Sequence, residues 1–267
     1  MFRQTRAEKH ESANSPVIGI GNEYPSGYRH ARHHHQRAQL LYAEYGTMLV
    51  DTPDQRWIVP PHEGVWIPRG APHGMRMLSD VGTRSVYFSE KTAGALPSAC
   101  CVVGVSALLR QLLIAAADLP IDYGPDSRAS KVMALIVDEV THAPVRPLSL
   151  PMPRHQQLAA RCRAFAQTPQ VGESIERWCR NLAMSRRTFT RIFRAQTGLS
   201  LGEWQRRACF QAAVQRLLAG ENVTRIALDQ GYSSPAAFTA MFRSITDMSP
   251  LAYLQQLAQN AAKPPIA

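Results

Sequence analysis

The stretch SIERWCRNLAMSRRTFTRIFRAQTG, residues 174–198, predicts two short helices that meet at a tight break. In the first helix the apolar side chains recur at the spacing of one helix face, on Ile175, Trp178, Cys179 and Leu182. Ser185 is a suitable N-cap for the second helix, and Gly198 is a suitable residue to end it. The pattern predicts a helix-turn-helix unit.

The second of these helices has an aromatic face and a basic face. Phe189, Ile192 and Phe193 form the apolar stripe, and the opposite side carries Arg186, Arg187, Thr190, Arg191 and Arg194. Guanidinium groups can read guanine edges in the major groove of DNA, and flanking charges can hold phosphates. We interpret this helix as a DNA-recognition helix. Taken alone, the stretch also fits an ordinary amphipathic helix with a solvated basic face.

Length and composition set the class of protein. The 267 residues suffice for two domains, and 45% hydrophobic with 19% charged residues is typical of a globular chain. We find no apolar run near the roughly 18 residues of a membrane span, and the first residues lack the apolar segment of a secretory signal. Five cysteines without a metal-binding spacing indicate a reducing compartment, so we predict a cytoplasmic location.

The positive charge is concentrated in the last third of the chain. Residues 1–153 hold 15 lysines and arginines against 14 acidic residues, whereas residues 154–257 hold 14 against 6. The second part therefore carries an excess of eight positive charges, which favours a polyanionic partner. A merely soluble basic surface would not explain the asymmetry.

The first third of the chain predicts a β-rich domain, residues 16–100, after a polar tail, residues 1–15, that we predict to be disordered. Its short apolar runs are separated by Gly and Pro and read VIGIG, LLYAEYG, TMLVD, RWIVPP, GVWIP and TRSVYF. This spacing favours an antiparallel barrel or sandwich. His33 and His35 would face the same side of a strand, and with His73 on a neighbouring strand they could hold a divalent metal.

These histidines resemble the motifs of the cupin barrel. The first cupin motif is matched by His33, His35, Gln39 and Gly46, and the second by Pro68, Gly70 and His73. Two positions depart from the family: Gln39 replaces the usual carboxylate ligand, and His62 replaces a glycine. We expect His33, His35, Gln39 and His73 to line a metal-free pocket for a small effector, with no cofactor. The alternatives are a divalent metal on His33, His35 and His73, or a barrel that serves only as a scaffold.

The middle of the chain predicts helices and then a linker. Residues 101–143 contain two amphipathic patterns, which we expect to pair with a second subunit, the alternative being packing within the chain. Residues 144–153 are rich in proline and predict a stiff linker to an all-helical domain, residues 154–258.

Inside that domain the helix–break–helix pattern occurs twice. Ser200 and Glu203 form a capping box for a long helix that joins the two units, and Ser234-Pro235 begins the second recognition helix. Its candidate DNA-binding residues are Ser234, Ala236, Thr239, Ala240 and Arg243. The fold class that we predict is therefore α+β multidomain, with a cupin-like β-barrel, appended helices and a domain of two helix-turn-helix units.

The double unit resembles the DNA-binding domain of the AraC/XylS transcription regulators over about 100 residues, in the strings LAMSRRTFTRIFRAQTGLSLGEW and IALDQGYSSPAAFTAMFRSITDMSPLAY. The resemblance implies base contacts from Arg187, Thr190 and Arg191 and from Ala236, Thr239 and Ala240. Two positions differ from the family pattern: Ala240 stands where a basic residue is common, and Asp247 replaces a glycine.

The sequence thus favours a cytoplasmic, dimeric transcription regulator, an activator or a repressor, that is not an enzyme. Its expected partners are double-stranded promoter DNA, a small-molecule effector and a second copy of the chain, with RNA polymerase as a further candidate and no membrane. The alternative function is a metal-dependent cupin enzyme with a helical appendage. The alternative leaves the charge asymmetry and both helix-turn-helix units unexplained. A basic RNA-binding protein would need exposed aromatic side chains, whereas the aromatics here lie on predicted buried faces.

Overall fold

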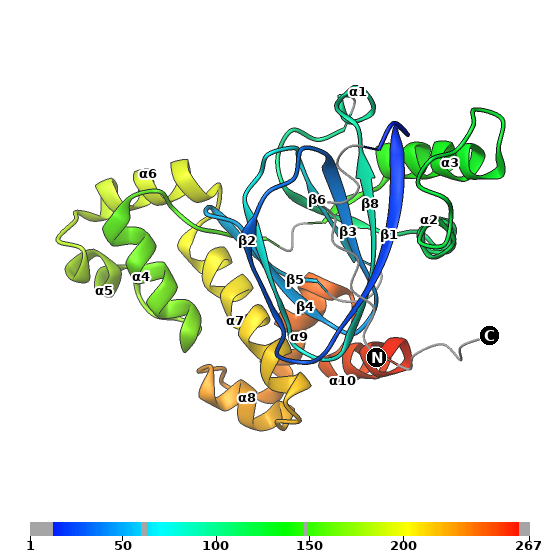
Figure 1. Ribbon diagram of the computed structural model, residues 1–267. Helices are drawn as coiled ribbons and strands as arrows, with labels where there is room; N and C mark the ends of the chain where they lie inside the picture. The colour runs from blue at the N-terminus through cyan, green and yellow to red at the C-terminus, as the bar shows by residue number, and fades with distance from the viewer. Residues whose placement is uncertain (1–12, 60–62, 95, 147–148, 262–267) are drawn as a thin grey trace. The chain divides into compact units, whose positions relative to one another are not determined.

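The computed structural model describes residues 13–59, 63–94, 96–146 and 149–261, with side chains up to Gln255 (Figure 1). Most of the predicted disordered tail and His62 lie outside these residues. The described chain forms two compact units. The first comprises residues 13–52, 59–146 and 257–261, and the second comprises residues 53–58 and 149–256.

The first unit contains a six-stranded antiparallel sheet with the strand order β1-β8-β3-β6-β9-β10. Its strands are β1 (Val17–Tyr24), β8 (Val81–Phe88), β3 (Ala38–Tyr45), β6 (Glu63–Ile67), β9 (Cys101–Gly104) and β10 (Val145–Arg146). The runs VIGIG, LLYAEYG, GVWIP and TRSVYF correspond to β1, β3, β6 and β8, which confirms these predicted strands. Residues 101–104, which we expected in a helical segment, instead form β9.

A second antiparallel sheet carries β4 (Met48–Asp51), β7 (His73–Met77) and β2 (Arg29–His33) as neighbours in the first unit. The predicted class is confirmed, but the predicted barrel is not closed, because among the described residues no strand is hydrogen-bonded into both sheets. The first sheet continues beyond β6 into β9 and β10 instead of joining the second. Strands β2 and β7 are absent from the predicted apolar runs, although His33 and His73 were expected on neighbouring strands. The strand that carries His33 ends there, so His35 lies just beyond β2 and not on the same strand as expected.

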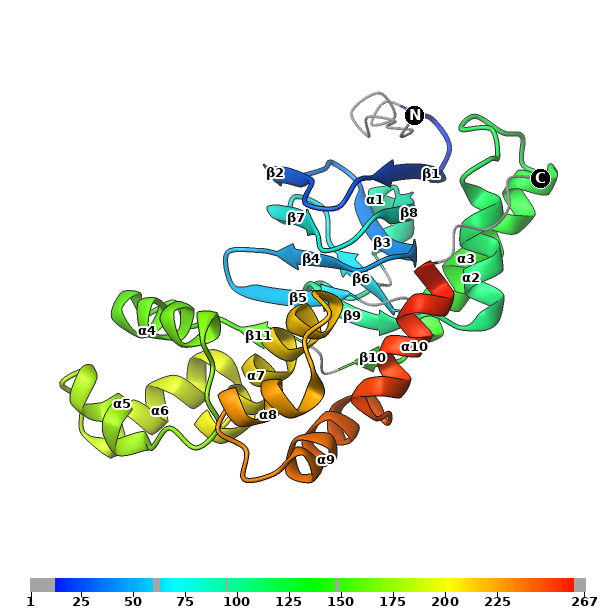
Figure 2. The same ribbon diagram turned by 90° about the horizontal axis from the view of Figure 1, so that it is seen from below.

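Helices α2 (Ala107–Ala116) and α3 (Arg128–His142) pack on one another, and α2 packs on β1 and β8 (Figures 1 and 2). A four-residue helix, α1 (Glu90–Ala93), follows β8. Ser106 and Ser127 begin the two long helices by accepting hydrogen bonds from the main-chain N–H groups of Leu109 and Ser130. The apolar faces of α2 and α3 join the core of the first sheet, with Leu109, Leu113, Met133 and Ile136 buried against Leu40, Trp66 and Phe88.

The second unit is mainly helical. Its helices are α4 (Gln156–Gln167), α5 (Ile175–Asn181), α6 (Arg186–Thr197), α7 (Leu201–Leu218), α8 (Val223–Asp229), α9 (Pro235–Thr246) and α10 (Pro250–Ala261), the last of which ends in the first unit. The predicted linker contributes β11 (Leu150–Pro151), which pairs with β5 (Gln55–Val59). Leu150 and Met152 are buried in the core that also holds Trp178, Phe189 and Trp204.

Among the described residues, no helix combines the length and apolar character needed to cross a lipid bilayer.

Candidate DNA-binding and effector sites

Helix α6 begins and ends where the sequence predicts. The Ser185 hydroxyl accepts a hydrogen bond from the Thr188 N–H, and Gly198 closes the helix with φ of 72° and an N–H bond to the Arg194 carbonyl. Phe189 and Phe193 are buried against Trp178 and Trp204. Because this aromatic face is fixed in the core, the opposite side of α6 faces solvent.

That exposed side carries the predicted DNA-contacting residues of the first unit. Arg186, Arg187, Thr190, Arg191 and Arg194 are all exposed. Arg186 forms an exposed ion pair with Glu176 of α5, with 3.4 Å between Nη1 and Oε1. This pair ties the first turn of α6 to the preceding helix.

Helix α9 repeats the arrangement with a different surface. Ser234 caps the helix by accepting from the Ala237 N–H at 3.2 Å, and Phe238 and Phe242 are buried behind it. Ala236, Ala240 and Arg243 are exposed, whereas Ser234 and Thr239 are half-buried. The outer face of α9 therefore has two methyl groups where α6 has guanidinium groups.

Helix α7 joins the two helix-turn-helix units. It has 18 residues and begins with the predicted capping box of Ser200 and Glu203. At 1.5 Å per residue its length is about 27 Å, comparable to the roughly 34 Å between successive major-groove faces on one side of DNA. The predicted recognition helices, α6 and α9, are thus separated in the chain by a segment that contains a helix of comparable length to this spacing.

The cluster of histidines lies on the second sheet of the first unit. His33 in β2 pairs directly with His73 in β7, and His35 follows two residues after His33. Ligand atoms of His33, His35 and His73 lie within 4.8 Å of one another. His33 Nε2 and His35 Nε2 are 3.1 Å apart, and the rings of His33 and His73 have centroids 4.4 Å apart. The three histidines that the sequence singled out are therefore brought together.

Main-chain carbonyls orient two of these rings. His33 Nδ1 lies 2.8 Å from the Ala31 carbonyl oxygen, and His73 Nδ1 lies 3.0 Å from the Ala71 carbonyl oxygen. A carbonyl only accepts hydrogen bonds, so each Nδ1 is the donor, and Nε2 of the neutral ring carries the lone pair. His73 Nε2 is buried and has no hydrogen-bond partner among the described residues.

Burial also favours the neutral form of His35 and His73. Burial and, to a smaller extent, the neighbouring histidines, His33 first, lower the pKa of His35 from 6.5 to about 3. Burial lowers the pKa of His73 to about 4 against the opposing effect of its hydrogen bond to Ala71. A neutral imidazole nitrogen with a lone pair, such as His73 Nε2, can accept a hydrogen bond from a ligand, and imidazoles also suit zinc, copper, iron or nickel.

Gln39 belongs to the first sheet and is buried. Its Nε2 donates to Ser85 Oγ and to Tyr87 Oη, both at 3.1 Å. The ring of Tyr87 in turn makes an edge contact with His35, with centroids 5.2 Å apart. Gln39 is thus linked to the histidine cluster through Tyr87.

The sequence did not identify two neighbours of the cluster. The ring of His30 lies 4.1 Å from that of His33, and Tyr87 contacts His35. His30 and His33 are three residues apart and would face opposite sides of a regular strand, but β2 has a register shift between them. The irregularity depends on pairing with β7, which the sequence alone does not reveal.

Both halves of the chain match known families. Residues 16–131 match the family described as an AraC-like ligand binding domain, and residues 178–256 match a helix-turn-helix domain family.

Similar proteins include the HTH-type transcriptional regulator NimR of Escherichia coli K12. It is 28% identical over 235 residues, which span 87% of this chain and 86% of that protein. An uncharacterized HTH-type transcriptional regulator of Haemophilus influenzae is 33% identical over 96 residues, or 36% of this chain and 32% of that protein. Among solved structures, fatty-acid-bound ToxT of Vibrio cholerae is 11% identical, with 94% of this chain and 99% of that chain covered and a TM-score of 0.39.

Proposed function

The chain belongs to the AraC family of transcription regulators, with a ligand-binding first part and a helix-turn-helix DNA-binding second part, and we propose that exposed residues of α6 and α9 contact its promoter DNA. The contacting residues are Arg186, Arg187, Thr190, Arg191 and Arg194 of α6, with Ser234, Ala236, Thr239, Ala240 and Arg243 in and before α9. The observation that carries the proposal is the exposed basic side of α6 opposite its buried phenylalanines.

Arg191 is our choice for a base-reading residue. A bidentate contact of an arginine with a guanine contributes about 1–3 kcal/mol of discrimination. We expect Arg191→Ala to relax the preference at one base-pair step of a duplex selected by the protein from a random pool. Arg163→Ala, which removes another exposed charge, from α4, is the control and should leave the preference unchanged. An equal loss of affinity for all sequences would show that Arg191 contacts a DNA phosphate and not a base.

We also propose that His33, His35, Gln39 and His73 form the effector site. The support is the convergence of the three rings and the unpartnered acceptor at His73 Nε2. An effector with N–H or O–H donors would satisfy such an acceptor without any metal.

Metal analysis separates this proposal from its alternative. We expect protein purified without chelating resin to lack a stoichiometric metal, and His35→Ala and His73→Ala to abolish the response of a reporter driven by a bound promoter. His34→Ala, at an exposed neighbouring position, should respond normally. A stoichiometric ion that is lost in His33→Ala would contradict the metal-free site, and turnover of a substrate by that protein would support a cupin enzyme. If neither His35→Ala nor His73→Ala changes the response, the effector binds elsewhere.

The remaining proposals concern the working state of the protein. We propose a cytoplasmic homodimer without catalytic turnover that acts on transcription with RNA polymerase. Leu108 of α2 and Leu135 of α3 are 52% and 49% exposed, which supports pairing of these helices with a second copy. Sedimentation of Leu108→Glu with Leu135→Glu should show monomers if these helices form the interface, and a dimer would refute it.

A further inference from the structure

Six residues from the first half of the chain belong to the DNA-binding unit. After β4 the chain leaves the first unit at Thr52, contributes residues 53–58 to the second unit, and returns at Val59. We call residues 53–58 the strap. Both of its ends continue into the first unit, so the strap is covalently joined to that unit on both sides.

The strap is hydrogen-bonded to the strand that precedes the helices of the second unit. Arg56 of β5 pairs with Leu150, and Gln55 pairs with Pro151, in antiparallel register. The Met152 N–H donates to the Asp54 carbonyl at 2.7 Å. The strap is thus joined to β11 by antiparallel pairing.

One face of α7 holds these paired segments. The Gln211 side chain donates from Nε2 to the Arg56 carbonyl at 3.0 Å, Trp204 Nε1 donates to the Pro151 carbonyl at 2.7 Å, and Arg207 Nη1 donates to the Ser149 carbonyl at 3.0 Å. The spacing of three and four residues places these side chains on the same side of α7. Gln211 is only 4% exposed, so the donor of this bond is buried while its acceptor on the strap is half-buried.

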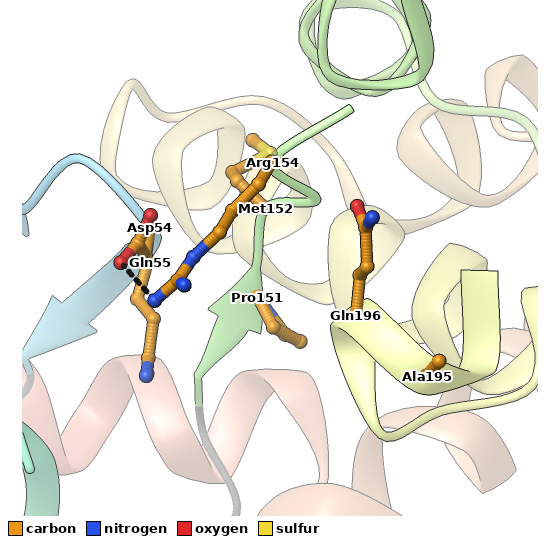
Figure 3. Close-up of a pocket in the computed structure, with 7 residues that line it drawn as sticks. All are labelled: Asp54, Gln55, Pro151, Met152, Arg154, Ala195 and Gln196. Atoms are coloured by element: carbon orange, nitrogen blue, oxygen red, sulfur yellow. Dashed lines mark ion pairs between the residues drawn. The ribbon is translucent and has the colours of Figure 1, made fainter. Parts of the chain in front are cut away.

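A cavity of about 350 Å³ lies beside the strap (Figure 3). Asp54 and Gln55 line it from the strap, Arg154 and Met152 from the chain after β11, and Gln196 from the end of α6. Asp54 Oδ2 and Arg154 Nη2 are 3.6 Å apart, and both side chains are largely exposed. The strap is therefore held firmly at α7 but has free space toward the recognition helix.

The other end of the strap leads to the histidine cluster. Asp51, the last residue of β4, pairs with Gly74 of β7, and Gly74 is adjacent to His73. A single residue, Thr52, separates Asp51 from the strap. His73 and the strap are therefore connected through one strand pair and a short piece of chain.

We propose that the strap is the coupling element of this regulator, through which occupancy at the histidine cluster changes the position of α7 and hence of both recognition helices. This inference rests on the proposed effector site. Coupling between two binding sites is reciprocal, so DNA binding must then alter the strands around His73. The reciprocity allows a test that needs no effector.

The test is hydrogen exchange of the full chain, free and bound to a duplex that it selects from a random pool. Gln211→Met removes the buried donor to the strap at nearly constant volume. Gln205→Met is its control, because Gln205 of α7 is 3% exposed and donates at 2.9 Å to the Glu173 carbonyl, away from the strap. We expect exchange in residues 54–58 to rise about tenfold in Gln211→Met, as for loss of a buried partner, but not in Gln205→Met.

DNA should change exchange in residues 73–77 of the wild type and of Gln205→Met, and this change should be lost in Gln211→Met. Asp54→Lys reverses an exposed charge beside Arg154 without altering the core, and it should weaken the DNA-induced change in exchange. Asp126→Lys, in the exposed loop before α3, should not weaken it. The coupling role of the strap would be contradicted if DNA changed exchange in residues 73–77 of Gln211→Met as much as in the wild type. It would also be contradicted if DNA caused no such change in the wild type. A protein that selects no duplex would instead contradict the proposed DNA-binding function, and the free-protein comparison would still decide whether Gln211 holds the strap.

Discussion

Two non-glycine residues of the second unit, Ala183 and Asp247, adopt the left-handed backbone region, as does Gly198. Gly198 ends α6 with φ of 72°, Asp247 ends α9 with φ of 60°, and Ala183 in the turn between α5 and α6 has φ of 50°. A Cβ atom in this region costs roughly 1–2 kcal/mol, which glycine avoids. The cost at Asp247 is offset in part by the tolerance of Asp for this region.

Two glycines at the ends of neighbouring helices should respond oppositely to alanine. A Cβ at Gly198 meets no atom within 4 Å, so Gly198→Ala should lower the free energy of unfolding by about 1 kcal/mol through backbone strain alone. Gly202, in the first turn of α7, has an ordinary helical backbone and meets only the end of Arg206. Gly202→Ala should raise the free energy of unfolding by up to about 0.5 kcal/mol. Urea unfolding measures both, and equal signs would contradict the backbone argument.

Glu63 at the start of β6 carries a cost that depends on pH. Burial raises the pKa of its carboxyl from 4.5 to about 7, although Arg146 of β10 lies 3.8 Å away and opposes the shift. The folded chain therefore binds a proton more tightly than the unfolded chain, and stability is lost as pH rises from 4.5 through about 7.

Glu63→Gln should remove that loss. We expect the variant to be more stable than the wild type by about 2 kcal/mol at pH 8, and equally stable or less so at pH 4. Asp126→Asn, at an exposed loop position, is the control and should show no such dependence. Thermal unfolding across this pH range measures the difference, and a gain that is the same at every pH would rule out ionisation of Glu63 as the cause.

At the scale of elements, the two recognition helices offer DNA different chemistry. The exposed side of α6 presents Arg187 and Arg191, while the corresponding side of α9 presents Ala236 and Ala240. Alanine cannot donate a hydrogen bond and offers only apolar contact, for example to a thymine methyl.

We therefore expect most of the sequence preference to lie in the half-site under α6. A scan of single base-pair changes should give penalties of about 1–3 kcal/mol in that half and smaller ones in the other. Ala240→Arg should add a preference to the weaker half. Equal penalties in both halves of the wild-type site would contradict the difference between the helices.

Some of these elements could be predicted from local sequence, whereas others depend on pairing between distant segments. Ser185 and Gly198 mark the ends of α6, so its bounds could be predicted from local capping chemistry. Strand β2 could not, because its residues Arg29–His33 are polar, largely exposed and without apolar alternation. The approach of His33 to His73 followed from motif spacing, whereas that of His30 depends on a bulge set by β7. Membership of the strap in the second unit depends on pairing with a strand far along the chain.

At the scale of the whole molecule, the DNA-binding unit begins before the predicted boundary at residue 154. Leu150 and Met152 are buried in its core, at 1% and 8% exposure. Burial of each such side chain contributes about 1.5–3 kcal/mol.

A fragment of residues 149–267 should consequently be more stable than one of residues 154–267, by about 3–5 kcal/mol. A fragment of residues 144–267 is the control and should match the first, because Val145 and Arg146 are exposed and add no core. Urea unfolding of the three measures the difference. If the shortest fragment is as stable as the others, Leu150 and Met152 do not stabilise the unit.

The strap also bears on how the chain is made. Its partner Gln211 lies 155 residues beyond Arg56, and ribosomes add about 5–20 residues per second. The strap therefore emerges roughly 8–30 seconds before α7 can receive it. During that interval its strand edge is unpaired on a nascent chain, which is the state most open to chaperones and to mispairing with a neighbouring copy. Slowing translation between the two segments should lengthen that exposure and lower the yield of native regulator.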